Sequence, residues 1–378
     1  MRTYPLFKVH VPVKETIAHL ECMFERGFIN EGAEVAELSE ALKIEIGTNS
    51  LVLTNSCTSA LTIALVLSGA GPGTEVVTTP MTCVATNTPI ANVGARLVWA
   101  DVDPRSGMID PASVAARITP RTVAVMAVAW AGSPPDLAAL QSVCAVRGVK
   151  LILDAAHAFG AEYRDAPAHR SADFTCYSFQ AIKHFTTGDG GALICRDTAD
   201  HRRAGRLKWF GLDRDAAKDR DGNWRGQQWH VDVEEAGYKF NMNNVAAAIG
   251  LAQIPHIRNI LDRHRSNARL YDELLAEAPG VRPATRPAGG LSSHWVYTVQ
   301  IAQAAIARDE TLQRLNAEGV MAGVVHVPND DYTTFRHSKT ELPNVRQFAA
   351  SQFSLPCGWW LDEDDVRHIA TRVLDIVR

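Results

Sequence analysis

The sequence feature that most constrains the fold is an alternation of short apolar segments with helical segments between residues 50 and 200. Near-continuous apolar runs are typical of strands in a sheet that is covered on both faces. Strands alternating with helices predict an α/β domain with a largely parallel sheet. The strands are expected at residues 75–79, 95–100, 122–129, 149–153, 174–179 and 191–195.

Helical periodicity extends this pattern on both sides. Helices are expected over residues 33–46, over residues 60–67 with Gly69 closing the helix, and from 243 to 276 with a break near Pro255. The segment 279–293 is rich in Pro, Gly and Ser and is the expected linker. Beyond it, a smaller α+β unit is predicted, with strands at 294–301 and 320–325 and helices at 304–317 and 363–377.

Two domains are therefore expected in this chain of 378 residues. Residues 1–250 would form an N-terminal segment and a large α/β domain, whose mostly parallel central sheet lies between helices. Residues 251–378 would form a linking helix and a small C-terminal α+β domain. The polar, charged segment 213–228 predicts a long surface loop.

Composition and charge exclude several classes of protein. The net charge is −4 and no run of lysine or arginine stands out, so neither nucleic acid nor a membrane is an expected partner. The seven cysteines are scattered, odd in number and never spaced as Cys-x-x-Cys, which argues against disulfides and a metal site. The N-terminus lacks the features of a signal peptide, and a reducing cytoplasm is the expected location.

Two segments place polar groups where an α/β sheet binds ligands. The run Asn55–Ala60 is small and polar and opens a helix, whose N-terminal N–H groups suit a phosphate. Asp154 ends an apolar strand, and the carboxyl ends of such strands face the ligand crevice. Each segment alone has a plainer explanation as a helix cap, and His157 alone would be a structural histidine.

Two further segments carry lysines. Lys183 follows a strand in a mostly apolar stretch and precedes a loop rich in Thr and Gly. Desolvation lowers the pKa of a lysine and favours the neutral amine that forms a Schiff base, although a loop lysine is more often a surface charge. Lys239 and Asn241 are two residues apart and would share one face of an extended segment.

In combination, these segments resemble the DegT-type family of sugar aminotransferases that depend on pyridoxal 5'-phosphate (PLP) and have the aspartate-aminotransferase fold (fold type I). The resemblance rests on "LILDAAHAFGAEY" and "SFQAIKHFTTGDGGAL", with "GFINEGAEVAEL", "GPGTEVVTTP", "VDPRSGMIDP" and "ITPRT" in the same order and spacing. It extends from about Gly27 to the end of the chain and implies that the large domain binds PLP.

The resemblance implies a role for individual residues. Lys183 matches the Schiff-base lysine, which also moves a proton, and Asp154 matches the carboxylate that pairs with the pyridine nitrogen. His157 matches the position near the ring hydroxyl. The family's phosphate-binding positions correspond to Cys57, Thr58 and Ser178.

Two positions depart from the family's pattern. Cys83 occupies the position of an aromatic residue that usually stacks on the PLP ring, so either Cys83 packs there or another ring supplies that face. The loop that reaches the phosphate of the neighbouring subunit has Lys239 in place of asparagine. That contact is expected from Lys239, Asn241 or both, within a homodimer.

The expected function is transfer of an amino group, from glutamate through pyridoxamine 5'-phosphate, to a keto sugar that is nucleotide-linked, for amino-sugar biosynthesis. A free keto sugar or a cyclitol is the alternative acceptor, and dehydration of a sugar is the alternative reaction. Relatives that dehydrate replace the lysine by histidine, whereas here His184 stands beside Lys183. An inactive binding or regulatory protein is the non-enzymatic alternative. The residues expected to contact the substrate are His184, Arg220, Arg225 and His326.

Overall fold

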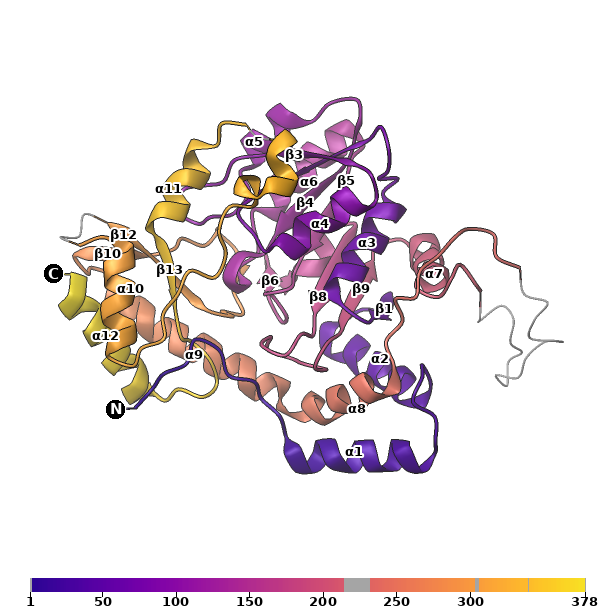
Figure 1. Ribbon diagram of the computed structural model, residues 1–378, viewed down its shortest axis with the longest axis horizontal. Coiled ribbons are helices and arrows are strands. Elements are labelled where there is room, and N and C mark those ends of the chain that lie inside the picture. The colour runs from indigo at the N-terminus through magenta and orange to yellow at the C-terminus, as the bar shows by residue number, and fades with distance from the viewer. Residues whose placement is uncertain (1, 214–231, 303–305, 339, 378) are drawn as a thin grey trace.

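A seven-stranded sheet forms the centre of the molecule's larger part (Figure 1). The computed structural model describes residues 2–213, 232–302, 306–338 and 340–377. The strand order is β1-β9-β8-β5-β4-β2-β3, and β9 runs antiparallel to both of its neighbours, whereas the pairings among β8, β5, β4, β2 and β3 are parallel. The mostly parallel α/β sheet is thus confirmed. The strands are β1 (Leu51–Thr54), β2 (Glu75–Thr78), β3 (Arg96–Trp99), β4 (Thr122–Val128), β5 (Lys150–Asp154), β8 (Phe174–Ser178) and β9 (Gly191–Cys195).

Helices cover both faces of this sheet, as the apolar strands required. Alternate side chains of a strand point to opposite faces, so Val125 and Ala127 pack in one core while Ala124 and Met126 pack in another. The first core includes residues of α2 (Ala33–Ile46), α5 (Pro111–Arg117), α6 (Leu137–Arg147) and α8 (Asn244–Gln253). The second includes residues of α3 (Cys57–Leu67), α4 (Val84–Asn92) and α7 (Thr198–Leu207).

A smaller antiparallel sheet and three helices form the C-terminal unit (Figure 1). Its strands are β10 (Gly280–Pro283), β12 (Tyr297–Ala302) and β13 (Gln352–Leu355), and its helices are α9 (Ile257–Leu275), α10 (Arg308–Ala317) and α12 (Glu363–Val377). Tyr4 packs in the core of this unit, and its N–H donates to the carbonyl of Gly319 across 2.8 Å. The start of the chain therefore joins the C-terminal unit, and the boundary at residue 250 stays a prediction.

Several elements differ from the sequence-based expectations. The predicted strand 320–325 is wrong: Val320 and Gly323 form only isolated bridges, to Tyr4 and Ser354. The helix expected from residue 60 begins at Cys57 instead, because Ser56 caps it by accepting from the N–H of Ser59. Helices between the strands were expected, but without bounds for α4–α7. The predictions did not include β1, α1 (Val13–Glu25), α11 (Pro343–Ser351) or the short strands β6 (Glu162–Tyr163), β7 (Ala166–Pro167), β10 and β11 (Gly290–Leu291), the last two of which lie in the expected linker 279–293.

None of the helices among the described residues combines the length and apolarity needed to cross a membrane. All seven cysteines are free thiols. Most of the predicted loop 213–228, with Arg220 and Arg225, lies outside the described residues.

Candidate active site

A cavity of about 300 Å³ lies where several strands of the large sheet end. Asp154 is the last residue of β5, and Ser178 is the last residue of β8. The start of α3 and the turn that carries Lys183 complete this wall. Trp295 and His326 close the cavity from the C-terminal part of the chain. The predicted residues His157, Cys57, Thr58 and Cys83 also line it.

The carboxylate of Asp154 is buried and firmly held. Its Oδ2 accepts a hydrogen bond from Thr86 Oγ1 at 2.7 Å, and its Oδ1 accepts from the Ala156 N–H at 3.0 Å. Burial raises the pKa of Asp154, while those two donors and the charge of Lys183 act in the opposite direction. The carboxylate is therefore held in one orientation, and a cation or an N–H group in the cavity would stabilise its charge.

The amine of Lys183 lies 3.6 Å from the centre of the Trp295 ring. Burial lowers the pKa of Lys183 to about 8, although the charge of Asp154 partly opposes this shift. Near pH 7, Lys183 is therefore a neutral amine in a larger fraction of the molecules than an ordinary lysine would be. A neutral amine is the form that attacks a carbonyl group.

Three rings stack to form one wall of the cavity. The ring of His157 stacks on Trp295 at 3.9 Å and on His326 at 5.3 Å between centroids. The Nε2 atoms of the two histidines are 3.5 Å apart. Burial is the main cause that lowers the pKa of both histidines, to about 4 for His326. The Nδ1 atom of His157 is buried and has no hydrogen-bond partner among the described residues, so it is available to a ligand.

The start of α3 supplies small polar groups to the cavity. Ser56 caps the helix, and Ser56, Cys57 and Thr58 line the cavity with Ser178. The first N–H groups of a helix have no partner within the helix, which makes this end a suitable site for an anion. Gly191 permits the arrangement, because a Cβ atom there would lie 2.5 Å from the Cys57 nitrogen.

Two residues that line the candidate site were not identified from the sequence. Thr86 contacts Asp154, and Trp295 is the tryptophan in the cavity wall. No helical period could have indicated the pair of Thr82 and Thr86, because Thr82 precedes α4 and Thr86 lies within it. No local signal marks Trp295, whose indole N–H donates to the Ile182 carbonyl at 2.8 Å across 113 residues of chain.

Other predicted residues lie away from the cavity lining. His184 is buried, and its Nε2 lies 3.0 Å from the Ser293 carbonyl. Lys239 contacts Asn241 at 2.5 Å and lies over the ring of Trp209, and Asn241 bridges to Thr54. Neither Lys239 nor Asn241 is among the cavity residues of its own chain.

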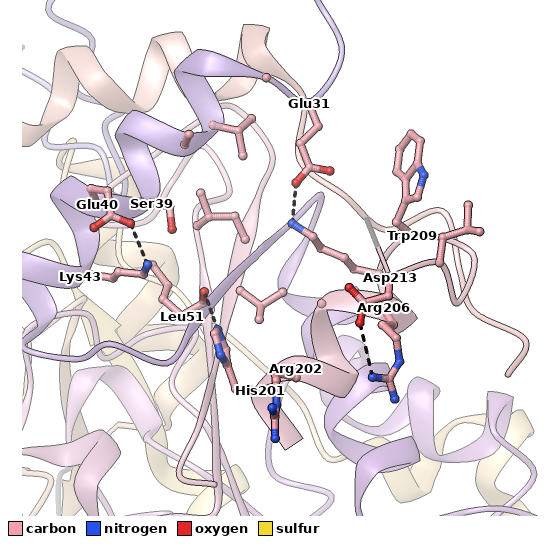
Figure 2. Close-up of a pocket in the computed structure, with 18 of the residues that line it drawn as sticks. Glu31, Ser39, Glu40, Lys43, Leu51, His201, Arg202, Arg206, Trp209 and Asp213 are labelled. Atoms are coloured by element: carbon pink, nitrogen blue, oxygen red, sulfur yellow. Dashed lines mark hydrogen bonds and ion pairs between the residues drawn. The ribbon is translucent and has the colours of Figure 1, made fainter. Parts of the chain in front are cut away.

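A larger, more open cavity of about 1040 Å³ lies between α2, the edge strand β1 and α7 (Figure 2). Several of its charged side chains form ion pairs, among them Lys208 with Glu31 at 2.6 Å and Lys43 with Glu40 at 2.7 Å. No group of three His, Cys, Asp or Glu side chains suited to a metal occurs in the described part of the chain. The buried carboxylate and the amine with a lowered pKa are in the smaller cavity, which we assign as the candidate active site.

Comparison with known proteins agrees with this geometry. Residues 12–374 match the model of the DegT/DnrJ/EryC1/StrS aminotransferase family. The chain is 31% identical over 374 residues to the dTDP-4-dehydro-2,3,6-trideoxy-D-glucose 4-aminotransferase of Saccharopolyspora spinosa, covering 97% of this chain and 95% of that protein. The structure of AtS13 from Actinomadura melliaura superposes with a TM-score of 0.92 at 35% identity, covering 99% of both chains. The sugar aminotransferase CalS13 from Micromonospora echinospora superposes with a TM-score of 0.90 at 34% identity, covering 98% of this chain and 99% of that one.

Proposed function

This chain belongs to the DegT/DnrJ/EryC1/StrS aminotransferase family, and from that premise we propose that it uses PLP to move an amino group from glutamate to a nucleotide-linked keto sugar. The chain is a sugar aminotransferase, like the relatives and structural neighbours that it matches over nearly its whole length. The observation that carries the cofactor proposal is the presence of Lys183 and Asp154 in one cavity with the capped start of α3.

The donor set of the cavity fits PLP. Lys183 would hold the aldehyde carbon as a Schiff base, and Asp154 would pair with the ring nitrogen. The α3 start with Cys57 and Thr58, together with Ser178, would hold the phosphate. When bound, the cofactor carries the amino group between the two half-reactions and accepts electrons from the carbon that loses a proton.

The chain's own residues would then orient the reactants and move the proton. Nζ of Lys183 would take the proton from the substrate carbon and deliver it to the cofactor carbon that had carried the aldehyde, and its lowered pKa of about 8 suits a group that both accepts and releases a proton. The fixed carboxylate of Asp154 would keep a proton on the ring nitrogen. The unpartnered Nδ1 of His157 supports a contact with a polar group of the cofactor.

The nucleotide-linked acceptor is proposed from the relative that acts on a dTDP-linked sugar. Among the described residues that line the cavity, Lys183 is the only lysine or arginine. The charge of a diphosphate must therefore be met beyond this lining. Arg220 and Arg225 remain our proposal for that contact, with His326 in the cavity wall beside the sugar.

A homodimer is proposed from the surface of α1 as well as from the loop with Lys239 and Asn241. Val13, Ile17 and Phe24 lie on one face of α1 and are 57–59% exposed. An exposed apolar stripe of this kind commonly marks a contact with another protein. A second copy of this chain would cover the stripe reciprocally about a twofold axis.

A screen of acceptors tests the proposed function. The enzyme is first loaded with amino groups from glutamate and then offered keto sugars, each in dTDP-linked, UDP-linked and free form, together with a ketocyclitol. Mass spectrometry should detect an amine product from a nucleotide-linked sugar, and Lys183→Ala should give none. Preference for the free sugars or the cyclitol would contradict the nucleotide, and a dehydrated product without nitrogen would contradict transamination.

A further inference from the structure

A chain of two buried hydroxyls leads to the carboxylate of Asp154. Thr86 Oγ1 lies 2.7 Å from Asp154 Oδ2, and Thr82 Oγ1 lies 2.9 Å from Thr86 Oγ1. Both threonines are 1% exposed and line the cavity. We propose that Thr86 is a positioning residue of the active site, which fixes the orientation and the charge of Asp154 and is itself fixed by Thr82. This proposal rests on the function proposed for Asp154.

The direction of both hydrogen bonds follows from the chemistry of the groups. An ionised carboxylate only accepts, and a threonine hydroxyl has one hydrogen to donate. Thr86 must therefore donate to Asp154, which leaves Thr82 as the donor to Thr86. The two hydrogen bonds thus have a single possible direction while Asp154 is charged, and protonation of Asp154 would disturb this order.

Thr82, the first residue of the hydroxyl chain, is anchored by its backbone. The carbonyl of Thr82 accepts from Asn329 Nδ2 at 2.8 Å, and the backbone N–H of Asn329 donates to the Pro80 carbonyl at 2.8 Å. Asn87 Nδ2 donates to Asn329 Oδ1 at 2.9 Å. The turn before α4 is thus held by the segment that also carries His326, so the hydroxyl chain has a fixed starting point.

Few other donors could replace Thr86. The Ala156 N–H binds the other oxygen, Oδ1, and the Cys57 thiol is 4.0 Å away. Among the described residues, Thr86 is the side chain with an oxygen donor to Asp154. A hydrogen bond to a charged acceptor is stronger than one between neutral groups, and it favours the charged form of a buried carboxyl.

The test compares three variants. Thr86→Val keeps the branched shape and removes the hydroxyl, whereas Thr86→Ser keeps the hydroxyl. Thr88→Val is the matched control, since Thr88 is a partly buried residue of the same helix whose hydroxyl donates to the Val84 carbonyl rather than to Asp154. The protein is labelled with ¹³C-aspartate, the infrared band of Asp154 is assigned with Asp154→Asn, and its titration is followed with and without PLP. The ionisable groups that act on Asp154 are Lys183, Cys57 on α3 and Cys176 on β8, and all three are retained.

In Thr86→Val, Asp154 should take up its proton at a higher pH than in the unaltered enzyme. Its kcat in the glutamate half-reaction should fall about tenfold with a small change in KM, because a lost charge-assisted hydrogen bond is worth about that factor. Thr86→Ser should restore both values, and Thr88→Val should change neither. An unchanged titration in Thr86→Val would overturn the proposal and make Thr86 a packing residue.

The infrared titration also separates this proposal from the proposed function. If Asp154→Asn remains fully active, the role of Asp154 fails, yet the titration still reports whether Thr86 holds its charge. Should Thr86→Val not fold, Thr82→Val removes the donor to Thr86 and should shift the titration in the same direction by a smaller amount. Absence of that shift would count against the hydroxyl chain.

Discussion

The Nζ atom of Lys183 lies 3.6 Å from the centre of the Trp295 ring, although 112 positions separate the two residues in the sequence. The indole N–H of Trp295 donates to the Ile182 carbonyl, so the ring is fixed to the turn that carries the lysine. Phe7 also stacks on the Trp295 ring, at 4.8 Å between centroids. The reactive amine is therefore held against a wall to which the N-terminal segment and the residues before β12 both contribute.

The first prediction concerns the chemistry of Lys183. Borohydride reduction of the purified enzyme should fix PLP to the peptide that contains Lys183, and Lys183→Ala should bind PLP weakly and lose turnover. Because the pKa is lowered from 10.5 to about 8, reactivity of the cofactor-free amine should rise with pH and level off above about pH 9. Peptide mapping measures the site, and label on another lysine would refute it.

The second prediction is that Asp154→Asn impairs catalysis much more than folding. An amide cannot keep the ring nitrogen of the cofactor protonated, so the glutamate half-reaction should slow by about a hundredfold or more. The thermal midpoint should change little, because the substitution removes a buried charge whose pKa burial already raises. Single-turnover rates within a few fold of the unaltered enzyme would make Asp154 a helix cap.

The third prediction is that each active site contains residues of two subunits. Lys183→Ala subunits mixed with subunits altered at both Lys239 and Asn241 should regain part of the lost activity, because some heterodimers contain one intact site. Light scattering should give the mass of a dimer throughout. After subunit exchange has been confirmed by mass spectrometry, a mixture as inactive as its components would contradict shared sites.

The fourth prediction is that the protein loses stability as the pH falls below about 6.5. Burial is the main cause that lowers the pKa of six histidines, which are His157, His169, His184, His264, His294 and His326. The pKa falls to about 4 for His264 and His326 and to about 3 for His294. The unfolded chain then binds more protons than the folded one, so the free energy of unfolding decreases with falling pH. Urea denaturation at pH 7.5 and pH 5.5 measures this, and equal stability at both would refute it.

The fifth prediction concerns the close approach of β9 to α3. In Gly191→Ala, the new Cβ atom would lie 2.5 Å from the Cys57 nitrogen and 2.6 Å from the Ser56 carbonyl carbon. The start of α3 must then move, which should destabilise the protein by about 1–3 kcal/mol and weaken PLP binding. Gly205→Ala is the control, because its Cβ would meet nothing within 4 Å. Denaturation and fluorescence titration measure the two effects, and equal behaviour of the two variants would contradict the argument.

Much of the fold follows from local sequence patterns. The expected strand 191–195 and the helices 33–46 and 363–377 coincide with β9, α2 and α12, because β9 is a continuous apolar run and the two helices have an apolar period. The strand predicted at 320–325 was wrong, since Val320 and Gly323 each form a single bridge, to two different segments, instead of a continuous ladder with one partner strand. Pairing partners, rather than apolar content, decide whether such a segment forms a strand.

The sequence by itself placed Asp154 at the carboxyl end of a strand, where such a sheet binds ligands, and its resemblance to the family implied that Lys183 belongs to the same site. Only the tertiary structure decided which side chains surround them. Thr86 reaches Asp154 from a helix 68 residues earlier in the chain, and His326 reaches His157 from 169 residues later. Contacts of this kind depend on how separate segments pack, and no periodicity within either segment records its partner.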